Sequence, residues 1–307
     1  MGISQYIREI GRGRDGSRDL TQDQACDLWG RLLDGHVSDL EIGAFCVAMR
    51  IKGETPAEMS GFLQATRERL ALIDHAGGPP VVLPSYNGSR KLPVLTPLLG
   101  MLLAARGVPV VMHGTPTDSV RVHTPEVLAL LGVAARGDTR SVAAGELAWF
   151  PTGLLCPGLQ RLLEVRQVVG LRNPAHSLVK RLNPCRGRAL VIGSYTHPEY
   201  AVSMAATFER TGADALLLRG TEGEPVADPR RQPQMEAFLG GKRRLLQAAL
   251  PGSLVSIPEL PPPDAPSTAR YTRAVLDGQS PVPAPLAMQV AQILQVRQAL
   301  LGGSSIT

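Results

Sequence analysis

The sequence has few aromatic residues, few cysteines and no long apolar run. Only 5 Phe, 5 Tyr and 2 Trp occur in 307 residues, so the core must be mainly aliphatic. The 4 Cys lack the Cys-x-x-Cys spacing of a zinc site and are typical of buried side chains in a reducing compartment. The N-terminus lacks the apolar stretch of a signal peptide, and no window approaches the ~20 apolar residues of a membrane span. We therefore expect a cytoplasmic protein without membrane contact.

The overall composition is that of a globular protein. Hydrophobic residues make up 44% of the chain, with 32 Gly and 26 Pro, which excludes a disordered, collagen-like or coiled-coil chain. The length suits one large domain or two unequal ones.

Positive charge is concentrated in the second half of the chain. Residues 1–150 carry 15 basic and 16 acidic side chains, whereas residues 151–307 carry 17 and 11. One cluster has a single acid, Glu164, among Arg161, Arg166, Arg172, Lys180, Arg181, Arg186 and Arg188. A second has Glu236 among Arg230, Arg231, Lys242, Arg243 and Arg244. A solvated surface explains either cluster alone, but two in one half favour a polyanionic partner.

The first 75 residues are expected to form four helices. Apolar periodicity and capping residues predict helices over 3–10, 21–35, 38–53 and 55–73. Thr55-Pro56-Ala57-Glu58 is the strongest start pattern, with Thr as N-cap, Pro at the first helical position and Glu at the third. These segments predict a helical subdomain over residues 1–75.

Residues 76–307 show the pattern of an α/β domain. Apolar strands are expected at 81–83, 108–112, 189–193 and 213–220, alternating with helices at 93–106, 125–132, 198–210 and 285–301. The Pro-rich stretch 258–266 is expected to be a surface connection. Nearly continuous apolar strands between helices predict a central, mainly parallel sheet.

Several segments resemble the anthranilate phosphoribosyltransferase family and the wider group of type III nucleoside phosphorylase folds. They are His113-Gly114, Glu126 to Gly132, Arg166 to Arg172, Leu182-Asn183-Pro184 and Gly212 to Glu224. The resemblance implies that helices within about 157–186 complete the helical subdomain. It also implies a Gly-Thr-Gly-Gly-Asp loop that holds the diphosphate of phosphoribosyl diphosphate, and an Asp-Glu pair that binds magnesium.

The sequence departs from the family at both of these elements. The diphosphate loop reads Pro84-Ser85-Tyr86-Asn87-Gly88-Ser89-Arg90-Lys91, in which Tyr86 and Ser89 are expected to fill space that glycines leave open. Glu222-Gly223-Glu224 replaces the Asp-Glu pair and is interpreted as a polar loop after a strand. We therefore expect no catalytic residue, no metal and no cofactor. The degenerate ancestral site would comprise Ser85, Tyr86, Asn87, Gly88, His113, Gly114, Asn183, Glu222 and Glu224.

Three residues have alternative interpretations. His113 could be a catalytic base, but at the end of a buried strand a structural or phosphate-facing role is favoured. Asn183 would line the acceptor site in the enzyme, although a turn-forming Asn before Pro is enough explanation. Arg121 lies where the family binds phosphate, and it could hold a phosphate or sulfate.

The stretch Gly220 to Pro225, followed by Asp228-Pro229-Arg230-Arg231, resembles the YbiB-type branch of this family. That branch implies sequence-independent nucleic-acid binding in a basic groove across a dimer. Arg161, Arg172 and Arg181 would be bidentate phosphate donors and Lys180 a point charge, with Lys180 and Arg181 on the solvent side of their helix. The full set of expected phosphate contacts is Arg90, Lys91, Arg121, Arg161, Arg166, Arg172, Lys180, Arg181, Arg230 and Arg231.

The leading hypothesis is binding of DNA or RNA, without sequence preference, by a catalytically degenerate phosphoribosyltransferase-like protein. No RNA-recognition motif, zinc finger or aromatic strip indicates base readout. The alternative is a pentosyl transferase that uses phosphoribosyl diphosphate with an altered acceptor, and a third possibility is a structural dimer. A homodimer is expected through an apolar face of the helical subdomain that includes Leu28, Leu32, Leu40, Ile42 and Phe45.

Overall fold

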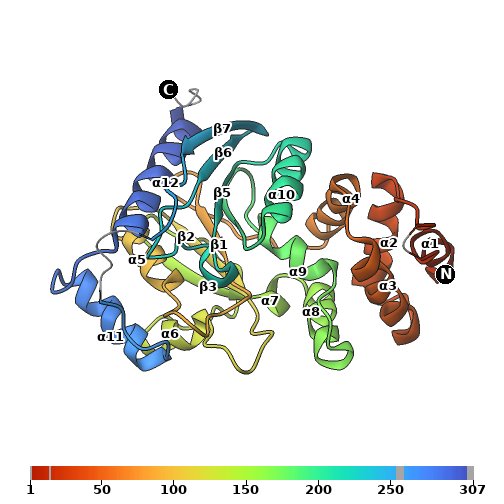
Figure 1. Ribbon diagram of the computed structural model, residues 1–307, viewed down its shortest axis with the longest axis horizontal. Helices are drawn as coiled ribbons and strands as arrows, with labels where there is room; N and C mark the ends of the chain where they lie inside the picture. The colour runs from red at the N-terminus through yellow and green to blue at the C-terminus, as the bar shows by residue number, and fades with distance from the viewer. Residues whose placement is uncertain (1, 14, 254–258, 303–307) are drawn as a thin grey trace.

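A computed structural model describes residues 2–13, 15–253 and 259–302. It contains a helical subdomain beside a larger α/β domain (Figure 1). The chain begins in the helical subdomain, and its last helix lies on the opposite side of the molecule against the sheet. The expected fold class is therefore confirmed.

The helical subdomain begins with α1 (Ser4–Ile10), α2 (Gln22–Asp34), α3 (Asp39–Lys52) and α4 (Pro56–Arg67). Thr21, Ser38 and Thr55 each form the expected capping box. In each box the N-cap hydroxyl accepts a backbone N–H of the first turn, which satisfies a donor that the helix itself cannot pair. The local sequence thus fixes where three of the four helices start.

Two later helices pack into the same hydrophobic cluster as α1–α4. They are α8 (Pro157–Val169) and α9 (Pro174–Leu178), and the 3-10 turn η1 (Val179–Arg181) follows directly. Leu159, Leu163 and Leu178 are buried with Trp29, whose ring stacks on Phe62 at a centroid distance of 4.6 Å. The chain therefore leaves the helical subdomain, builds part of the sheet and then returns.

The sheet has seven strands in the order β3-β2-β1-β4-β5-β6-β7. The first five in chain order pair in parallel, whereas β6 and β7 pair antiparallel at one edge. Because parallel strands end at the same edge of a sheet, the loops after β1, β2, β4 and β5 meet there. The strands are β1 (Val81–Pro84), β2 (Val110–Gly114), β3 (Leu147–Pro151), β4 (Leu190–Tyr195), β5 (Ala215–Arg219), β6 (Met235–Leu239) and β7 (Lys242–Gln247).

Apolar side chains alternate between the two faces of the sheet. Val81, Leu83 and Ile192 face one hydrophobic cluster, and Val82 and Val191 face another. Buried residues of α5 and α12 pack in the first cluster, and those of α10 pack in the second. The remaining elements are α5 (Thr96–Ala104), α6 (Thr124–Leu130), α7 (Thr152–Leu155), α10 (Pro198–Thr211), η2 (Thr221–Gly223), α11 (Ala265–Leu276) and α12 (Ala284–Gly302).

The structure corrects several expected boundaries. Helix α4 ends at Arg67, before the expected Ile73, and the chain beyond it pairs with other segments: Ala71 donates its N–H to the Leu155 carbonyl and Ile73 donates to the Pro184 carbonyl. The sequence did not predict β3, β6, β7 or α11. Pro266 lies in the first turn of α11 and not in a connection, while Pro258 lies outside the described residues. Among the described helices, none is long and apolar enough to cross a membrane.

Candidate functional site

Two loops that are far apart in the sequence meet at the carboxyl edge of the sheet. One is the expected diphosphate loop, residues 85–92, which follows β1. The other, residues 220–226, follows β5 and contains η2. Side chains of the second loop enter the first, and the two carboxylates that do so, Glu222 and Glu224, define the site.

The Glu224 carboxylate is buried inside the diphosphate loop. Its Oε1 accepts the backbone N–H groups of Asn87 at 2.8 Å and Gly88 at 2.9 Å. Its Oε2 accepts the hydroxyl of Thr96 at 3.0 Å and the hydroxyl of Ser85. Only 1% of Glu224 is exposed, so these four donors replace the water that would otherwise solvate the charge.

Glu222 binds the second half of the same loop. Its Oε1 accepts the Ser89 hydroxyl at 2.7 Å and the backbone N–H groups of Lys91 at 2.8 Å and Leu92 at 3.1 Å. Its Oε2 accepts the Arg90 N–H at 3.2 Å and lies 3.4 Å from Nη1 of Arg121. Burial raises the pKa of Glu222, but these hydrogen bonds outweigh it and hold the pKa below its ordinary value. The carboxylate is therefore charged at neutral pH.

The backbone between the two carboxylates is held in an uncommon conformation. Glu222 has φ +50°, the one positive φ of a non-glycine residue within the described chain. Gly223 has φ +88°, and a Cβ there would lie 1.9 Å from Nδ2 of Asn87. The Gly223 carbonyl accepts Nζ of Lys180 at 3.0 Å and the Ser194 hydroxyl at 2.8 Å. Such strain persists only where the surrounding contacts impose it.

The carboxylates of Glu222 and Glu224 act as internal anions that bind the N–H groups of the diphosphate loop. Consecutive backbone N–H groups form a concavity that suits phosphate oxygens, and here carboxylate oxygens occupy that concavity. A diphosphate would have to displace two hydrogen-bonded carboxylates. Residues 222–224 form a loop after a strand, as interpreted, and what the sequence did not predict is that its two glutamates anchor it to the loop after β1.

The same carboxylates do not fit a magnesium site. Magnesium requires carboxylate oxygens free to complete a near-octahedral shell. Each of the four oxygens of Glu222 and Glu224 already accepts at least two N–H or O–H donors. Within the described ranges, no group of three or more His, Cys, Asp and Glu is placed to hold a metal.

Tyr86 does not fill the diphosphate space, contrary to expectation. Its ring is buried in the hydrophobic cluster of the helical subdomain, and its hydroxyl lies 2.7 Å from Nδ1 of His113. Thr152 donates to the same hydroxyl at 3.0 Å, so Tyr86 donates to His113 and fixes its neutral tautomer. Burial lowers the pKa of His113 to about 3. The structural role favoured for His113 agrees with this geometry, and a phosphate-facing one does not, since the ring is fully buried.

Gly114 and Asn183 support the backbone around the site. A Cβ at Gly114 would lie 1.8 Å from the Ser85 carbonyl, so only glycine lets these two loops pass. Oδ1 of Asn183 accepts the Cys185 N–H at 2.8 Å, which is the turn expected before Pro184. Asn183 lines a different cleft from the Glu222–Glu224 loop, and the structure does not bring it to that site.

Six of the ten expected phosphate-binding side chains have internal partners. Asp118 pairs with Arg166 at 3.0 Å and with Arg121 at 3.6 Å, and Asp228 pairs with Arg230 at 2.8 Å. The other three donate to carbonyl oxygens: Arg161 to Leu32, Lys180 to Gly223 and Arg181 to Ser177.

The expectation that Lys180 and Arg181 face solvent is wrong. Arg181 is buried, and Lys180 is only partly exposed. The reason is that α9 has five residues and passes directly into η1, which turns both side chains toward the sheet domain. Arg90, Lys91, Arg172 and Arg231 form no side-chain hydrogen bond or ion pair with any described residue, so they are available to an external anion.

Part of the second basic cluster lies on an edge strand of the sheet. Lys242, Arg243 and Arg244 belong to β7, whose outer edge has no further strand within the described part of the chain. Charged residues are typical of such edges because they prevent pairing with another chain. Arg243 pairs with Glu236 at 2.8 Å across the β6–β7 ladder. Part of this cluster therefore has a structural explanation.

We expect Glu224→Ala to destabilise the protein by about 2–4 kcal/mol, because it leaves four buried donors without an acceptor. Urea denaturation measures this change in the free energy of unfolding. Glu199→Gln, on the exposed first turn of α10, is the control and should change it by less than about 0.5 kcal/mol. Equal effects of the two substitutions would show that the Glu224 contacts contribute nothing to stability.

Comparison with known proteins agrees with the fold. Residues 4–70 match a family model described as the helical bundle domain of a glycosyl transferase family. The uncharacterized protein YbiB of Escherichia coli strain K12 is 40% identical over 299 residues, covering 95% of this chain and 93% of YbiB.

The enzymes of the family are more distant. Anthranilate phosphoribosyltransferase of Salinispora arenicola is 30% identical over 202 residues, which cover 63% of this chain and 57% of that protein. The crystal structure of the Thermus thermophilus enzyme superposes with a TM-score of 0.73 at 22% identity, over 98% of this chain and 89% of that one, a likeness in fold. The chain belongs to the anthranilate phosphoribosyltransferase-like family, and its high similarity to YbiB extends over nearly its whole length.

Proposed function

We propose that this protein binds nucleic acid without sequence preference and has lost phosphoribosyl transfer. The observation that carries the proposal is the occupation of the diphosphate loop by Glu222 and Glu224. A transferase of this fold needs that loop open for its diphosphate substrate. With the loop closed by carboxylates, binding of anions must depend on other parts of the molecule.

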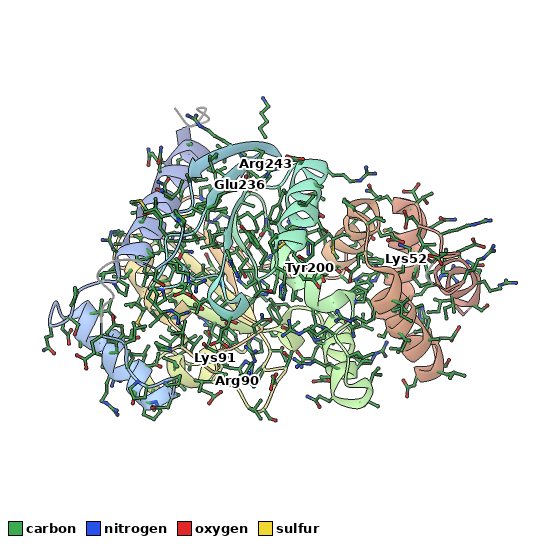
Figure 2. All side chains as sticks on the ribbon, in the orientation of Figure 1. Lys52, Arg90, Lys91, Tyr200, Glu236 and Arg243 are labelled. Atoms are coloured by element: carbon green, nitrogen blue, oxygen red, sulfur yellow. The ribbon has the colours of Figure 1, made fainter. Side chains whose placement is uncertain are left out.

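Exposed basic side chains supply the attraction for a polyanion. Arg90 and Lys91 are exposed side chains of the loop itself, in the lower part of the α/β domain (Figure 2). Their backbone N–H groups bind Glu222, which fixes the position from which the two side chains project. Contacts of this kind read phosphate charge and carry no base information. Sequence-independent binding is the consequence.

A second copy of the chain would double this basic surface. Of the residues expected at a dimer interface, Leu28, Leu32, Ile42 and Phe45 are buried in the subdomain itself, so that part of the expectation is wrong. Leu40 is 84% exposed, and with Val47 and Ile51 it forms an apolar stripe on α3. The stripe borders a shallow apolar groove between α1 and α3. We propose that this stripe is the homodimer interface.

Affinity for duplex DNA should depend strongly on salt if phosphates are the ligand. The slope of log affinity against log salt should be about −0.9 per phosphate that the protein neutralises. Replacing Arg90 and Lys91 with Ala should make this slope shallower by about 0.9 for each phosphate that is no longer neutralised. The same change should lower the affinity for DNA of every sequence to the same extent. Fluorescence anisotropy with labelled duplexes of unrelated sequence, at several salt concentrations, measures both effects.

The matched control is the pair Arg8→Ala and Lys242→Ala. Both side chains are exposed, have no partner among the described residues and lie on α1 and β7, away from the loop. This pair removes the same charge and should change the slope less. If both pairs change it equally, attraction is diffuse and the loop is not an interface; if the unmodified protein does not bind, the proposal is wrong.

The alternative, a phosphoribosyltransferase with an altered acceptor, draws on the identity to the Salinispora enzyme. We expect no saturable binding of phosphoribosyl diphosphate in the presence of magnesium and no release of pyrophosphate, since the loop donors are occupied. Calorimetry and a pyrophosphate assay on the unmodified chain check this. Micromolar binding together with pyrophosphate release would establish the alternative.

The dimer proposal makes a separate prediction. Val47→Glu places a charge in the apolar stripe of α3 and should convert a dimer to a monomer at micromolar concentration, as measured by sedimentation velocity. Val168→Glu is the control, because Val168 on α8 is also exposed but lies outside the stripe. A monomeric unmodified protein, or equal effects of the two changes, would contradict the proposal.

A further inference from the structure

A cavity of about 340 Å³ lies between the helical subdomain and the carboxyl end of β4. Its walls come from the α3–α4 connection, the segment from α8 to η1, and the loop from β4 into α10. It is separate from the cleft beside Arg166, which is lined by residues of the β2–α6 connection and α8. Pockets that bind small ligands range from about 300 to 1,000 Å³, so this cavity suits a ligand of the size of one nucleotide.

The charge of the cavity is unbalanced. Its lining contains Arg50, Arg172, Lys180 and Arg181 but one carboxylate, Glu54, which leaves a formal charge of +3. Burial lowers the pKa values of Arg172, Lys180 and Arg181, to about 8 for Lys180 and about 10 for Arg181. Burying cations without enough anions costs free energy, and a bound anion would recover it.

Arg172 is a cation of the cavity lining that is free to bind an anion. It is partly exposed and forms no hydrogen bond or ion pair with a described residue. Nε of Arg181 and Nε2 of His176 also lack partners within the described chain, but both atoms are buried and present no surface to the cavity. Arg172 is therefore an unpaired cation that a ligand can reach, and it lies beside Lys180 on the same segment of the lining.

The opposite wall adds a helix N-terminus. Helix α10 is 14 residues long, and its N-cap, His197, makes no side-chain capping hydrogen bond. The first backbone N–H groups of such a helix and its dipole favour an anion. His197 and Tyr200 of the same turn line the cavity, with ring centroids 6.3 Å apart. Tyr200 is 39% exposed and lies where α10 faces the helical subdomain (Figure 2).

We propose that this cavity binds one nucleotide, with its phosphate between Arg172, Lys180 and the N-terminus of α10 and its base against Tyr200. The excess of cations, with Arg172 unpaired, and the N-terminus of α10 account for the phosphate, and the partly exposed ring offers a stacking surface that any base can use. The nucleotide is either a free nucleoside monophosphate or the 5′-terminal nucleotide of a strand. In the second case the inference rests on the proposed nucleic-acid binding and adds recognition of a strand end.

Lys180 should make this binding dependent on pH. Its ammonium lies between the cavity and the Glu222–Glu224 loop, where burial, Arg172 and Arg181 lower its pKa and Glu224 opposes them. A bound phosphate stabilises the ammonium form, so binding takes up a proton when Lys180 is neutral. Affinity should therefore decrease as the pH rises from about 7.5 to 9.5, a range that spans the pKa of about 8.

The test is calorimetric titration of the full chain with adenosine 5′-monophosphate and with adenosine. The monophosphate should bind, and adenosine should bind at least about tenfold more weakly, because it lacks the group that pairs with the cations. Arg172→Ala should weaken monophosphate binding about tenfold or more while the fold is retained, since Arg172 has no partner among the described residues. Arg8→Ala, at an exposed arginine of α1 whose side chain has no partner among the described residues, is the control and should leave monophosphate binding unchanged.

Oligonucleotides with and without a 5′-phosphate distinguish the two sources. If only the 5′-phosphorylated strand binds, and Arg172→Ala abolishes its preference over the 5′-hydroxyl strand, the ligand is a strand end and the cavity assignment holds. If adenosine monophosphate binds in an Arg172-dependent way but duplex DNA does not, the cavity stands and the proposed nucleic-acid function fails. If neither probe binds, or if Arg172→Ala and Arg8→Ala have equal effects, the cavity is not a nucleotide site.

Discussion

The buried Glu224 carboxylate is the contact on which the carboxyl edge of the sheet depends. It joins the loop after β1 to the loop after β5 through two backbone N–H groups and two hydroxyls. A carboxylate can be buried only if such donors replace its water, and the loop donors can be buried only if an acceptor satisfies them. The buried carboxylate and the buried loop donors thus require one another. Glu222 satisfies the N–H groups of Lys91 and Leu92 in the same way.

On the proposed function, these hydrogen bonds change the chemistry that the fold can perform. In the enzymes that the sequence resembles, the loop after β1 binds a diphosphate. Here its N–H groups are satisfied by the protein, and Arg121 is neutralised by Glu222 and Asp118. The cations that remain without carboxylates lie elsewhere, on the exposed side of the loop and in the cavity beside α10. The fold therefore keeps an excess of positive charge at this edge after its original anion site is closed.

Sequence reasoning predicted the elements whose cause is local. Thr21, Ser38 and Thr55 cap helices through residues three positions away, and the apolar strands are recognisable because both faces are buried. It failed where the cause is distant. Strand β7 is a charged edge and lacks the apolar pattern. Nothing local to Glu222-Gly223-Glu224 indicates that a loop from the first half of the chain supplies its hydrogen-bond donors. The one local signal is a Gly between two acids after a buried strand, which allows both carboxylates to point to the same loop.

Lys180 shows how the closed loop and the open cavity depend on one another. Its ammonium donates to the Gly223 carbonyl, between the two glutamates, and also lines the cavity. Glu224 favours the charged form of Lys180, whereas burial and Arg172 oppose it. Removing the Glu224 charge would thus leave the cavity cations less stable as well as the loop donors unpaired. On the proposed function, the carboxylates that exclude a diphosphate from one site help to keep the neighbouring site charged for another phosphate.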